Sequence, residues 1–257
     1  MAAEPVPAQA GVYVYGIFPG DIEVAGEQSG VGEPPGLLRL VRGGDLAALV
    51  SDVDVSRLLG TPADLRIHQE ILDRSAAALP VLPMRFGAVM TSDEAVIDEL
   101  LEPHREEFAA VLDGLEGYAQ YVVKGRYDQD AILAEVLAGD PEAERLRAQI
   151  QDADPVATRD ARIALGELVS RAITARREAD TRALGSDMAG LSAASLVRDP
   201  THELDAVHVA FLLDNSQARR LEQVVSEIAR QWQGRIALRV LGPMAAYDFV
   251  GAAGTEG

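Results

Sequence analysis

The first half of the chain begins with apolar runs at strand-like spacing. Residues 11–18 are rich in aromatic and β-branched side chains, which is typical of a strand, and Pro19-Gly20 ends this run. Two further apolar runs, residues 37–42 and 45–53, flank Gly43-Gly44, and this arrangement predicts a β-hairpin. The chain is therefore expected to open with an antiparallel sheet.

A helix with clear start signals follows this sheet. Thr61 is the expected N-cap, Pro62 the first helical residue, and Asp64 the acidic partner of a capping box. Apolar residues then recur at helical spacing as far as Pro80, with His68 among them. We expect His68 to be a buried or rim histidine that makes one hydrogen bond.

Residues 81–89 predict a short strand that is interrupted by Pro83. Two helices are expected next, the first capped by Thr91-Ser-Asp-Glu94 and the second opened by Pro103. Glycines then break the pattern at Gly117, which we take as a domain boundary.

The second half is expected to follow the order strand, helices, strand, helix, strand. Two helices are predicted to start at Asp140-Pro141 and Asp154-Pro155 and to run towards a break that begins at Gly185. An amphipathic helix closed by Gly234 follows later. The predicted strands are residues 118–127, 206–213 and 236–241, with a fourth near 195–198 or in the tail.

This order favours a ferredoxin-like antiparallel sheet with helices on one face. We therefore predict an α+β protein of two domains with antiparallel sheets and packed helices. Residues 1–117 would form the N-terminal α+β domain, and residues 118–257 a C-terminal ferredoxin-like domain with a long helical insertion.

The composition narrows the classes of partner. The 257 residues carry a net charge of −18, which repels nucleic-acid phosphate and anionic lipid, so neither nucleic acid nor membrane is expected as a partner. Cysteine is absent, which excludes disulfides, thiolate metal sites and a cysteine nucleophile. No apolar run is long enough to cross a bilayer and no signal peptide is visible, so a cytoplasmic location is expected.

Candidate catalytic residues are few. The four histidines, His68, His104, His202 and His208, match no recognised metal-ligand spacing, and no nucleotide-binding or triad motif is present. We therefore expect no catalytic residue, no cofactor and no metal. Two alternatives stay open: an enzyme with a histidine–carboxylate site on the ferredoxin-like domain, and a small-molecule sensing module.

The most specific motif is Val81-Leu-Pro-Met-Arg-Phe-Gly87. A proline inside an apolar strand confines that strand to an edge or a bulge, because proline cannot donate to the ladder. Arg85 and Phe86 then lie at the strand end, where we expect the fold to hold them in place. A structural and a binding role for Arg85 remain equally open.

Together with other segments, this motif resembles the gas vesicle protein F/L family over nearly the whole chain. The chain departs from the family pattern at Gln120, where a glutamate is common, and at Met244-Ala245-Ala246, where Trp-Pro-Pro is common. The matching segments are Tyr13-Val-Tyr-Gly-Ile17, residues 43–51, His68-Gln-Glu-Ile-Leu72, residues 81–87, Val123-Lys124, Ala210-Phe-Leu-Leu213, and Gly242-Pro243 with Tyr247 and Phe249.

The resemblance implies a non-enzymatic assembly factor or minor component of gas vesicles. It would bind the small hydrophobic shell protein, limit its aggregation during vesicle nucleation, and have other gas vesicle accessory proteins as further partners. Its location would be the cytoplasm and the vesicle. The family-signature residues, which are also candidate partner-binding residues, are Pro83, Arg85, Phe86, Gly87, Gly242, Pro243, Tyr247 and Phe249.

Overall fold

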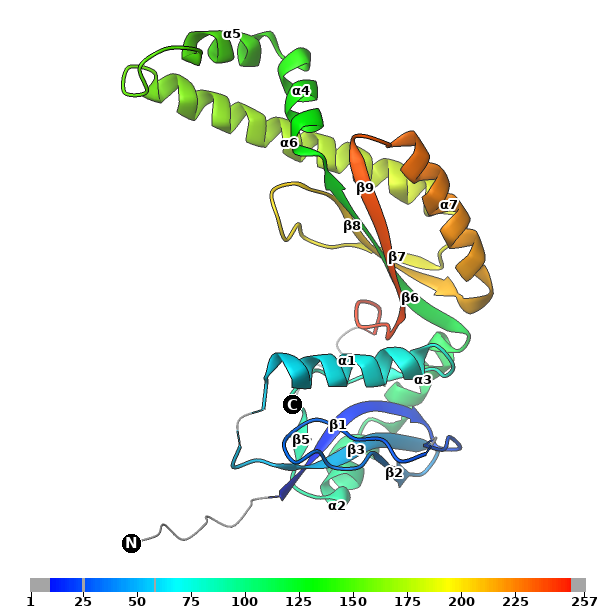
Figure 1. The fold of residues 1–257 in the computed structure, drawn as a ribbon. Helices are drawn as coiled ribbons and strands as arrows, with labels where there is room; N and C mark the ends of the chain where they lie inside the picture. Colours follow the sequence, from blue (N-terminus) through cyan, green and yellow to red (C-terminus); the bar gives the residue numbers. More distant parts are fainter. Residues whose placement is uncertain (1–9, 25, 58, 251–257) are drawn as a thin grey trace, which may run out of the picture. The chain divides into compact units, whose positions relative to one another are not determined.

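The chain is an α+β protein with two antiparallel sheets, as predicted (Figure 1). The computed structural model describes residues 10–24, 26–57 and 59–250. Its contacts define two compact units: residues up to Gln120 together with the segment from Gly242, and Tyr121–Leu241. The sequence had placed the C-terminal segment with the second domain, whereas in the structure its contacts lie in the first unit.

The sheet of the first unit has the strand order β2-β3-β1-β4, with β5 also paired to β1. The predicted hairpin across Gly43-Gly44 is confirmed, since β2 and β3 pair antiparallel and Gly44 has a φ of 60° that suits glycine. Pro83 interrupts the predicted strand 81–89, which forms two short pieces on β1. The strands are β1 (Ala10–Pro19), β2 (Arg39–Gly43), β3 (Leu46–Asp54), β4 (Leu82–Pro83) and β5 (Val89–Met90).

Both faces of this sheet are covered. Eight consecutive residues of β1 after Ala10 are buried, which requires packing on each side of the strand because side chains alternate between faces. The face of Tyr13 and Tyr15 packs under helix α1, and the helices that follow β5 also pack on the sheet (Figure 1). The helices are α1 (Pro62–Ala76), α2 (Asp93–Ala95), the π-helix η1 (Val96–Leu101) and α3 (Arg105–Leu115).

The predicted cap of α1 is confirmed, and that of α2 lies elsewhere. Thr61 and Asp64 form the expected capping box. Ser92, rather than Thr91, caps α2, because its side chain accepts from the backbone N–H of Ala95 at 3.2 Å. A short α-helical turn then changes to π-helical bonding over η1.

The sheet of the second unit has the order β7-β8-β6-β9. Numbered along the chain, these strands and their helices give β-α-β-β-α-β with the first and third strands in the centre, which is the ferredoxin-like arrangement. The predicted fourth strand near 195–198 is confirmed as β7. The strands are β6 (Tyr118–Tyr127), β7 (Ala194–Val197), β8 (Asp205–Asp214) and β9 (Ile236–Met244).

Helix α6 starts later and ends later than the sequence predicts. Asp154-Pro155 opens a turn, and the helix begins only after Thr158. It then continues through Gly185, because Leu184 and Met188 are fully buried and this packing outweighs the roughly 1 kcal/mol that a helical glycine costs. The helices of the second unit are α4 (Gln129–Gly139), α5 (Pro141–Ile150), α6 (Arg159–Met188), the 3-10 turn η2 (Asn215–Gln217) and α7 (Ala218–Gln231).

A buried ionic group joins α6 to two other parts of the second unit. Asp180 on α6 accepts a hydrogen bond from the Tyr127 hydroxyl at 2.6 Å. Its carboxylate also accepts two hydrogen bonds from the Arg235 guanidinium, at 2.7 and 2.5 Å. These bonds hold α6 against the end of β6 and the start of β9. No helix in the described part of the chain is long and apolar enough to cross a membrane.

Candidate functional site

The N-terminus of α1 fixes the position of His68 one turn further on. The Asp64 carboxylate accepts from the Thr61 hydroxyl at 2.8 Å and from the backbone N–H of Gly32 at 3.1 Å. Burial raises the pKa of Asp64, whereas the hydrogen bonds from Thr61, Gly32 and Gly60 lower it. Together the hydrogen bonds have the larger effect, so the pKa of Asp64 lies below its ordinary value. An ionised Asp64 therefore ties the helix start to the loop before β2.

His68 is buried and bonded at both ring nitrogens. Nδ1 lies 2.9 Å from the Tyr13 hydroxyl, and Nε2 lies 3.2 Å from the Met84 carbonyl oxygen and 3.1 Å from the Tyr247 hydroxyl. Because a carbonyl oxygen only accepts, Nε2 carries the proton and Nδ1 accepts from Tyr13. Burial lowers the pKa of His68 to about 4, so the ring is neutral near pH 7.

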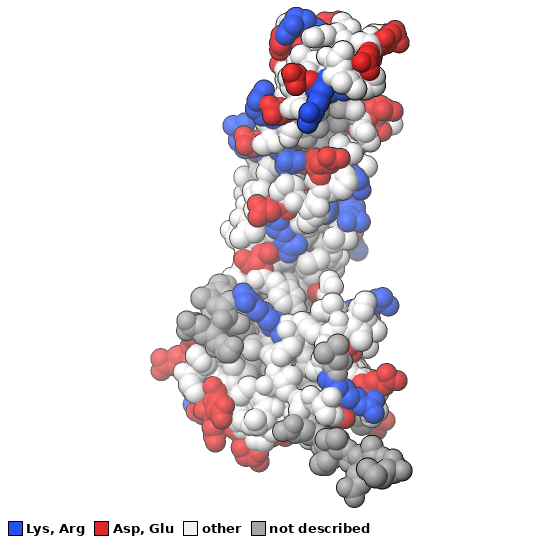
Figure 2. Space-filling view, turned by 90° about the vertical axis from the view of Figure 1, so that its left-hand side faces the viewer, with Lys and Arg blue, Asp and Glu red and all other residues white. Residues whose placement is uncertain are grey.

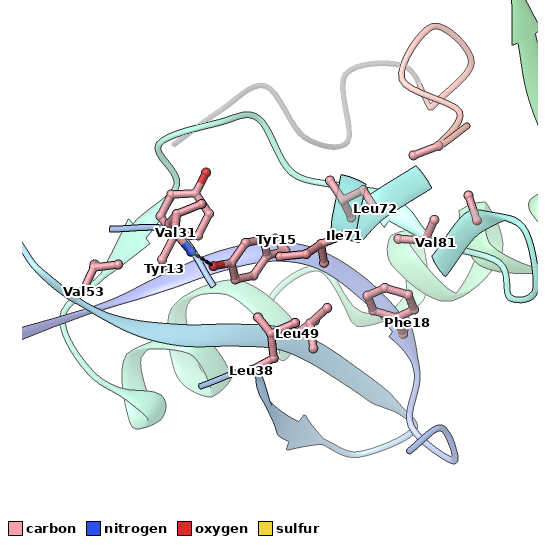
Figure 3. Packing of buried hydrophobic residues seen from close by; sticks show 12 residues of the cluster. Tyr13, Tyr15, Phe18, Val31, Leu38, Leu49, Val53, Ile71, Leu72 and Val81 are labelled. Atoms are coloured by element: carbon pink, nitrogen blue, oxygen red, sulfur yellow. Dashed lines mark hydrogen bonds between the residues drawn. The ribbon is translucent and has the colours of Figure 1, made fainter. Parts of the chain in front are cut away.

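Tyr15 forms a second polar link close to His68. Its hydroxyl oxygen accepts from the Val31 N–H at 2.7 Å, drawn as a dashed line in Figure 3, and the hydroxyl is hydrogen-bonded to Ser51 Oγ at 2.8 Å. A Cβ added at Gly30 would lie 2.2 Å from this hydroxyl, so only glycine allows the loop to approach so closely. The Tyr15 ring stacks on His68, with ring centroids 5.7 Å apart.

The specific motif of residues 81–87 packs against the same group. The Gly87 N–H donates to the Tyr13 hydroxyl at 3.1 Å, and its φ of 93° is a conformation that favours glycine. The Phe86 ring lies 5.6 Å from the His68 ring and 5.8 Å from the Tyr13 ring, both in edge contact. Phe86 is therefore positioned by the fold, as expected.

Arg85 differs from this expectation. Its side chain is exposed and makes no hydrogen bond or ion pair with any residue that the structure describes. Pro83, by contrast, is buried in β4, opposite Gly16 of β1. The two residues of one motif thus have different surroundings: Pro83 belongs to the sheet, and Arg85 points into solvent.

The C-terminal segment reaches this cluster from the other end of the chain. The Ala245 N–H donates to Asp73 Oδ1 at 3.1 Å, one turn and a half along α1 from His68, while Tyr247 contacts His68 itself. Burial raises the pKa of Asp73 above its ordinary value, although the bond from Ala245 opposes this. Phe249 is half-buried, and Gly242 with Pro243 is exposed at the end of β9.

Two positions that depart from the family pattern contact each other. Gln120 is fully buried, and its Nε2 donates to the Met244 sulfur at 3.5 Å. Its Oε1 accepts from the Asp248 N–H at 3.1 Å. An ionised glutamate could not donate to a thioether, so Gln120 is the residue type that satisfies both partners. Gln120 and Met244, which both differ from the family pattern, therefore fit each other, and Gln120 bonds to the C-terminal segment at Met244 and Asp248.

The structure thus brings together Phe86, Gly87 and Tyr247 of the predicted site residues, around a centre that the sequence analysis did not assign to the site. That centre is Tyr13, Tyr15 and His68. His68 was expected to be buried with one hydrogen bond, and it is bonded at both ring nitrogens. Tyr13 and His68 lie in segments that carry the family resemblance, which was the available signal. His68 and Asp73 of α1 bond to Tyr247 and Ala245, so the arrangement holds the C-terminal segment against α1.

Phe86→Ala is expected to lower the free energy of unfolding by about 2–3 kcal/mol, less than for a fully buried ring because Phe86 is half-buried. Phe86→Leu should lose less than half of that, since it keeps much of the apolar volume. Urea denaturation followed by far-ultraviolet circular dichroism measures both. An Ala variant as stable as the wild type would show that this ring does not support the cluster.

Comparison with known proteins shows which family the chain resembles. The profile described as "Gas vesicle synthesis protein GvpL/GvpF" matches residues 11–251. A gas vesicle protein F from Streptomyces sp. is 32% identical over 239 residues, covering 93% of this chain and 98% of the relative. A gas vesicle protein L from Streptomyces sp. is 26% identical, covering 86% of this chain and 85% of the relative.

Solved structures share the fold. The crystal structure of GvpF from Anabaena sp. aligns with a TM-score of 0.79 at 23% identity, covering 94% of this chain and 98% of that one. GvpF from Microcystis aeruginosa aligns with a TM-score of 0.76 at 21% identity, covering 93% and 98%. These structures show that the chain has the α+β fold of the two GvpF proteins. The chain belongs to the GvpL/GvpF family, and its role is related to gas vesicles.

Proposed function

We propose that this chain binds the small hydrophobic shell protein of gas vesicles and limits its aggregation during vesicle nucleation, with other accessory proteins as further partners. The observation that carries the proposal is the family match, which extends over residues 11–251 and aligns with 98% of a gas vesicle protein F. The family match leaves no long part of the chain unassigned.

Charge supports this proposal. The net charge of −18 would oppose association between complexes that each contain one copy of the chain. On the face drawn in Figure 2, Lys and Arg are interspersed with Asp and Glu rather than gathered in a basic band. Such a surface suits a protein that keeps a self-associating partner dispersed, and it offers no extended track for nucleic acid.

The edge of the second sheet offers an apolar contact of the expected kind. Strand β7 is at one end of the strand order, so its outer edge presents backbone groups that a partner strand can pair with. Leu196 and Val197 on this strand are 40% and 63% exposed. An extended apolar segment of the shell protein could add to this edge, with burial of these side chains as the main source of affinity.

The enzymatic alternative gains no specific observation. Among the described residues, the ring of His104 contacts a carboxylate, with Nδ1 3.5 Å from Glu107 Oε2, but this pair lies on the exposed start of α3. His208 contacts a backbone carbonyl, that of Asp199, at 3.2 Å. The same part of the chain holds no group of three or more His, Cys, Asp or Glu able to bind a metal. The sensing alternative would need an enclosed ligand cavity, and two hollows beside α6, of about 480 and 610 Å³, are open to solvent.

Co-expression tests the proposal directly. The shell protein should be found in the supernatant and co-elute with this chain in gel filtration, whereas alone it should pellet. Val197→Lys should weaken the complex, and Val156→Lys, at an apolar residue that is 82% exposed in the turn before α6, is the matched control. Raising the salt concentration should weaken the complex only mildly, because burial rather than charge provides most of the affinity.

Shell protein that pellets equally with and without this chain, and never co-elutes with it, would refute the proposal. Equal binding by the Val197→Lys and Val156→Lys variants would keep the function but remove β7 as the contact.

A further inference from the structure

Three cationic side chains share the face of the second sheet that lies opposite the helices. A Cβ added at Gly125 would lie 2.7 Å from the side chain of Leu238, which packs in the core beneath α6 and the end of α7. Gly125 therefore faces the helices. Its neighbours on β6, Lys124 and Arg126, point to the opposite, open face, because side chains alternate along a strand. Arg239 follows Leu238 on β9 and shares that open face.

These cations surround one hollow, which we call the basic hollow. It has a volume of about 320 Å³ and is lined by Lys124, Arg126 and Arg239, together with Thr201 and His202 from the loop before β8. Lys124 Nζ donates to Thr201 Oγ1 at 2.7 Å, and an Arg126 Nη2 lies 3.0 Å from His202 Nε2. Lys124 is thus held in place before any partner arrives, which lowers the entropy cost of binding.

The one acid that lines the hollow does not neutralise it. Asp205 is 3% exposed, and its Oδ2 accepts from the Thr201 N–H, the Thr201 hydroxyl and the His202 N–H at 2.8, 2.8 and 3.0 Å. Burial raises the pKa of Asp205, whereas these hydrogen bonds and the charge of Lys124 lower it. The lowering effects together are larger, so the pKa of Asp205 lies below its ordinary value. The carboxylate is therefore an ionised internal anchor of the loop, and it balances only Lys124.

Arg126 and Arg239 remain uncompensated. Both are exposed, and Arg239 makes no hydrogen bond or ion pair with any residue that the structure describes. A guanidinium offers several N–H donors in a planar fork that matches a carboxylate. Two free guanidinium groups beside a fixed ammonium are unusual on a chain whose net charge is −18.

We propose that the basic hollow binds a short acidic segment of a partner protein. Charge complementarity selects carboxylates, and the arginine fork gives them bidentate partners. A short segment fits within the hollow, whereas a nucleic acid would extend past it along a chain whose net charge is −18 and would be repelled. This contact is separate from the apolar contact with the shell protein, and we expect salt to weaken it much more strongly.

Fluorescence anisotropy with a labelled peptide of alternating Glu and Ser tests the proposal on the full chain. The wild type should bind this peptide and not a matched Gln-Ser peptide, and raising salt from about 50 to about 300 mM should weaken binding about tenfold. Arg239→Glu should also weaken it about tenfold, and should leave the fold intact because Arg239 has no partner to lose. Arg219→Glu, an exposed arginine of α7 outside the hollow, is the matched charge reversal and should bind as the wild type does.

Equal weakening by Arg239→Glu and Arg219→Glu would overturn the proposal, since the effect would then follow net charge alone. Tighter binding of an oligothymidylate, or full displacement of the peptide by millimolar inorganic phosphate, would also overturn it in favour of a nucleic-acid or free-anion site. Because the shell protein is absent from these measurements, a failure here leaves the co-expression result unaffected. Conversely, loss of shell binding in co-expression does not change the peptide result.

Discussion

Asp180→Ala is expected to lower the free energy of unfolding of the second unit by about 3 kcal/mol. Asp180 is 7% exposed and is bonded to both Tyr127 and Arg235. Its removal leaves a guanidinium and a buried hydroxyl without their acceptor. The loss stays at the lower end for buried ion pairs, because the Arg235 side chain is 29% exposed and has Glu135 3.8 Å away.

The single tryptophan makes this measurement specific to one unit. Trp232 lies at the end of α7, and the Arg235 guanidinium carbon is 5.9 Å from its ring centroid. Its fluorescence in a urea titration therefore reports on the second unit, which matters because a chain of two units need not unfold in one step.

Asp180→Asn is the matched control for charge. It keeps the size of the side chain and one acceptor oxygen but removes the ion pair with Arg235, so its loss of stability should be smaller than that of Asp180→Ala. The Asp180→Ala/Arg235→Ala double variant should be destabilised by less than the sum of the two single variants. Strictly additive effects would show that the two side chains do not interact.

The second large effect concerns pH and the first unit. The pKa of His68 is about 4 in the folded chain, against about 6.5 for an unfolded histidine. Between these values the unfolded chain binds the proton and the folded chain does not, so the stability contributed by neutral His68 is fully present above about pH 6.5 and is lost as the pH falls towards 4. The total loss is about 3 kcal/mol.

His68→Gln isolates this contribution. Glutamine can bond to Tyr13 and to the Met84 carbonyl but does not titrate, so the Gln variant should lack the His68 part of the pH dependence, while carboxylates such as Asp64 and Asp73 titrate in both proteins. Urea titrations of both proteins between about pH 4 and pH 7 give the difference. The same slope in the two proteins, or an NMR titration of the His68 ring near pH 6.5, would contradict the expectation.

Protonation of His68 should also loosen the C-terminal segment. Charging the ring adds a proton at Nδ1, which can then no longer accept from Tyr13, and places a cation among Tyr13, Tyr15 and Tyr247. Hydrogen exchange of the Ala245 and Asp248 amides, which bond to Asp73 and Gln120, is a local measure of this segment. Faster exchange at acid pH in the wild type than in His68→Gln, after correction for intrinsic rates, is the expected result.

Much of the secondary structure could be predicted from the sequence, because its signals are local. The capping box of Thr61 and Asp64 needs only four consecutive residues, and the hairpin across Gly43-Gly44 needs only the turn and its two flanking runs. The apolar stripe of α7 and the order of strands and helices in the second half were sufficient to indicate the ferredoxin-like sheet. The net charge and the absence of cysteine also followed directly from the residues.

Local signals were insufficient where packing opposed them. A glycine at 185 and a proline at 155 are sound reasons to end and to start a helix, yet α6 begins after Thr158 and continues to Met188. The burial of Leu184 and Met188, which decides the end of this helix, depends on elements far along the chain.

The tertiary structure alone decided how the family-signature residues come together. His68 and Tyr247 are 179 residues apart, and no periodicity or turn signal relates two positions so distant. The same holds for Gln120 with Met244, and for the three cations of the basic hollow, which come from two strands that are neighbours only in the folded sheet. The sequence by itself therefore determined which elements form and what chemistry they carry, because those properties depend on neighbouring residues. Only the fold decided that His68 is neutral and that the C-terminal segment closes onto α1, because both follow from burial by residues distant in the chain.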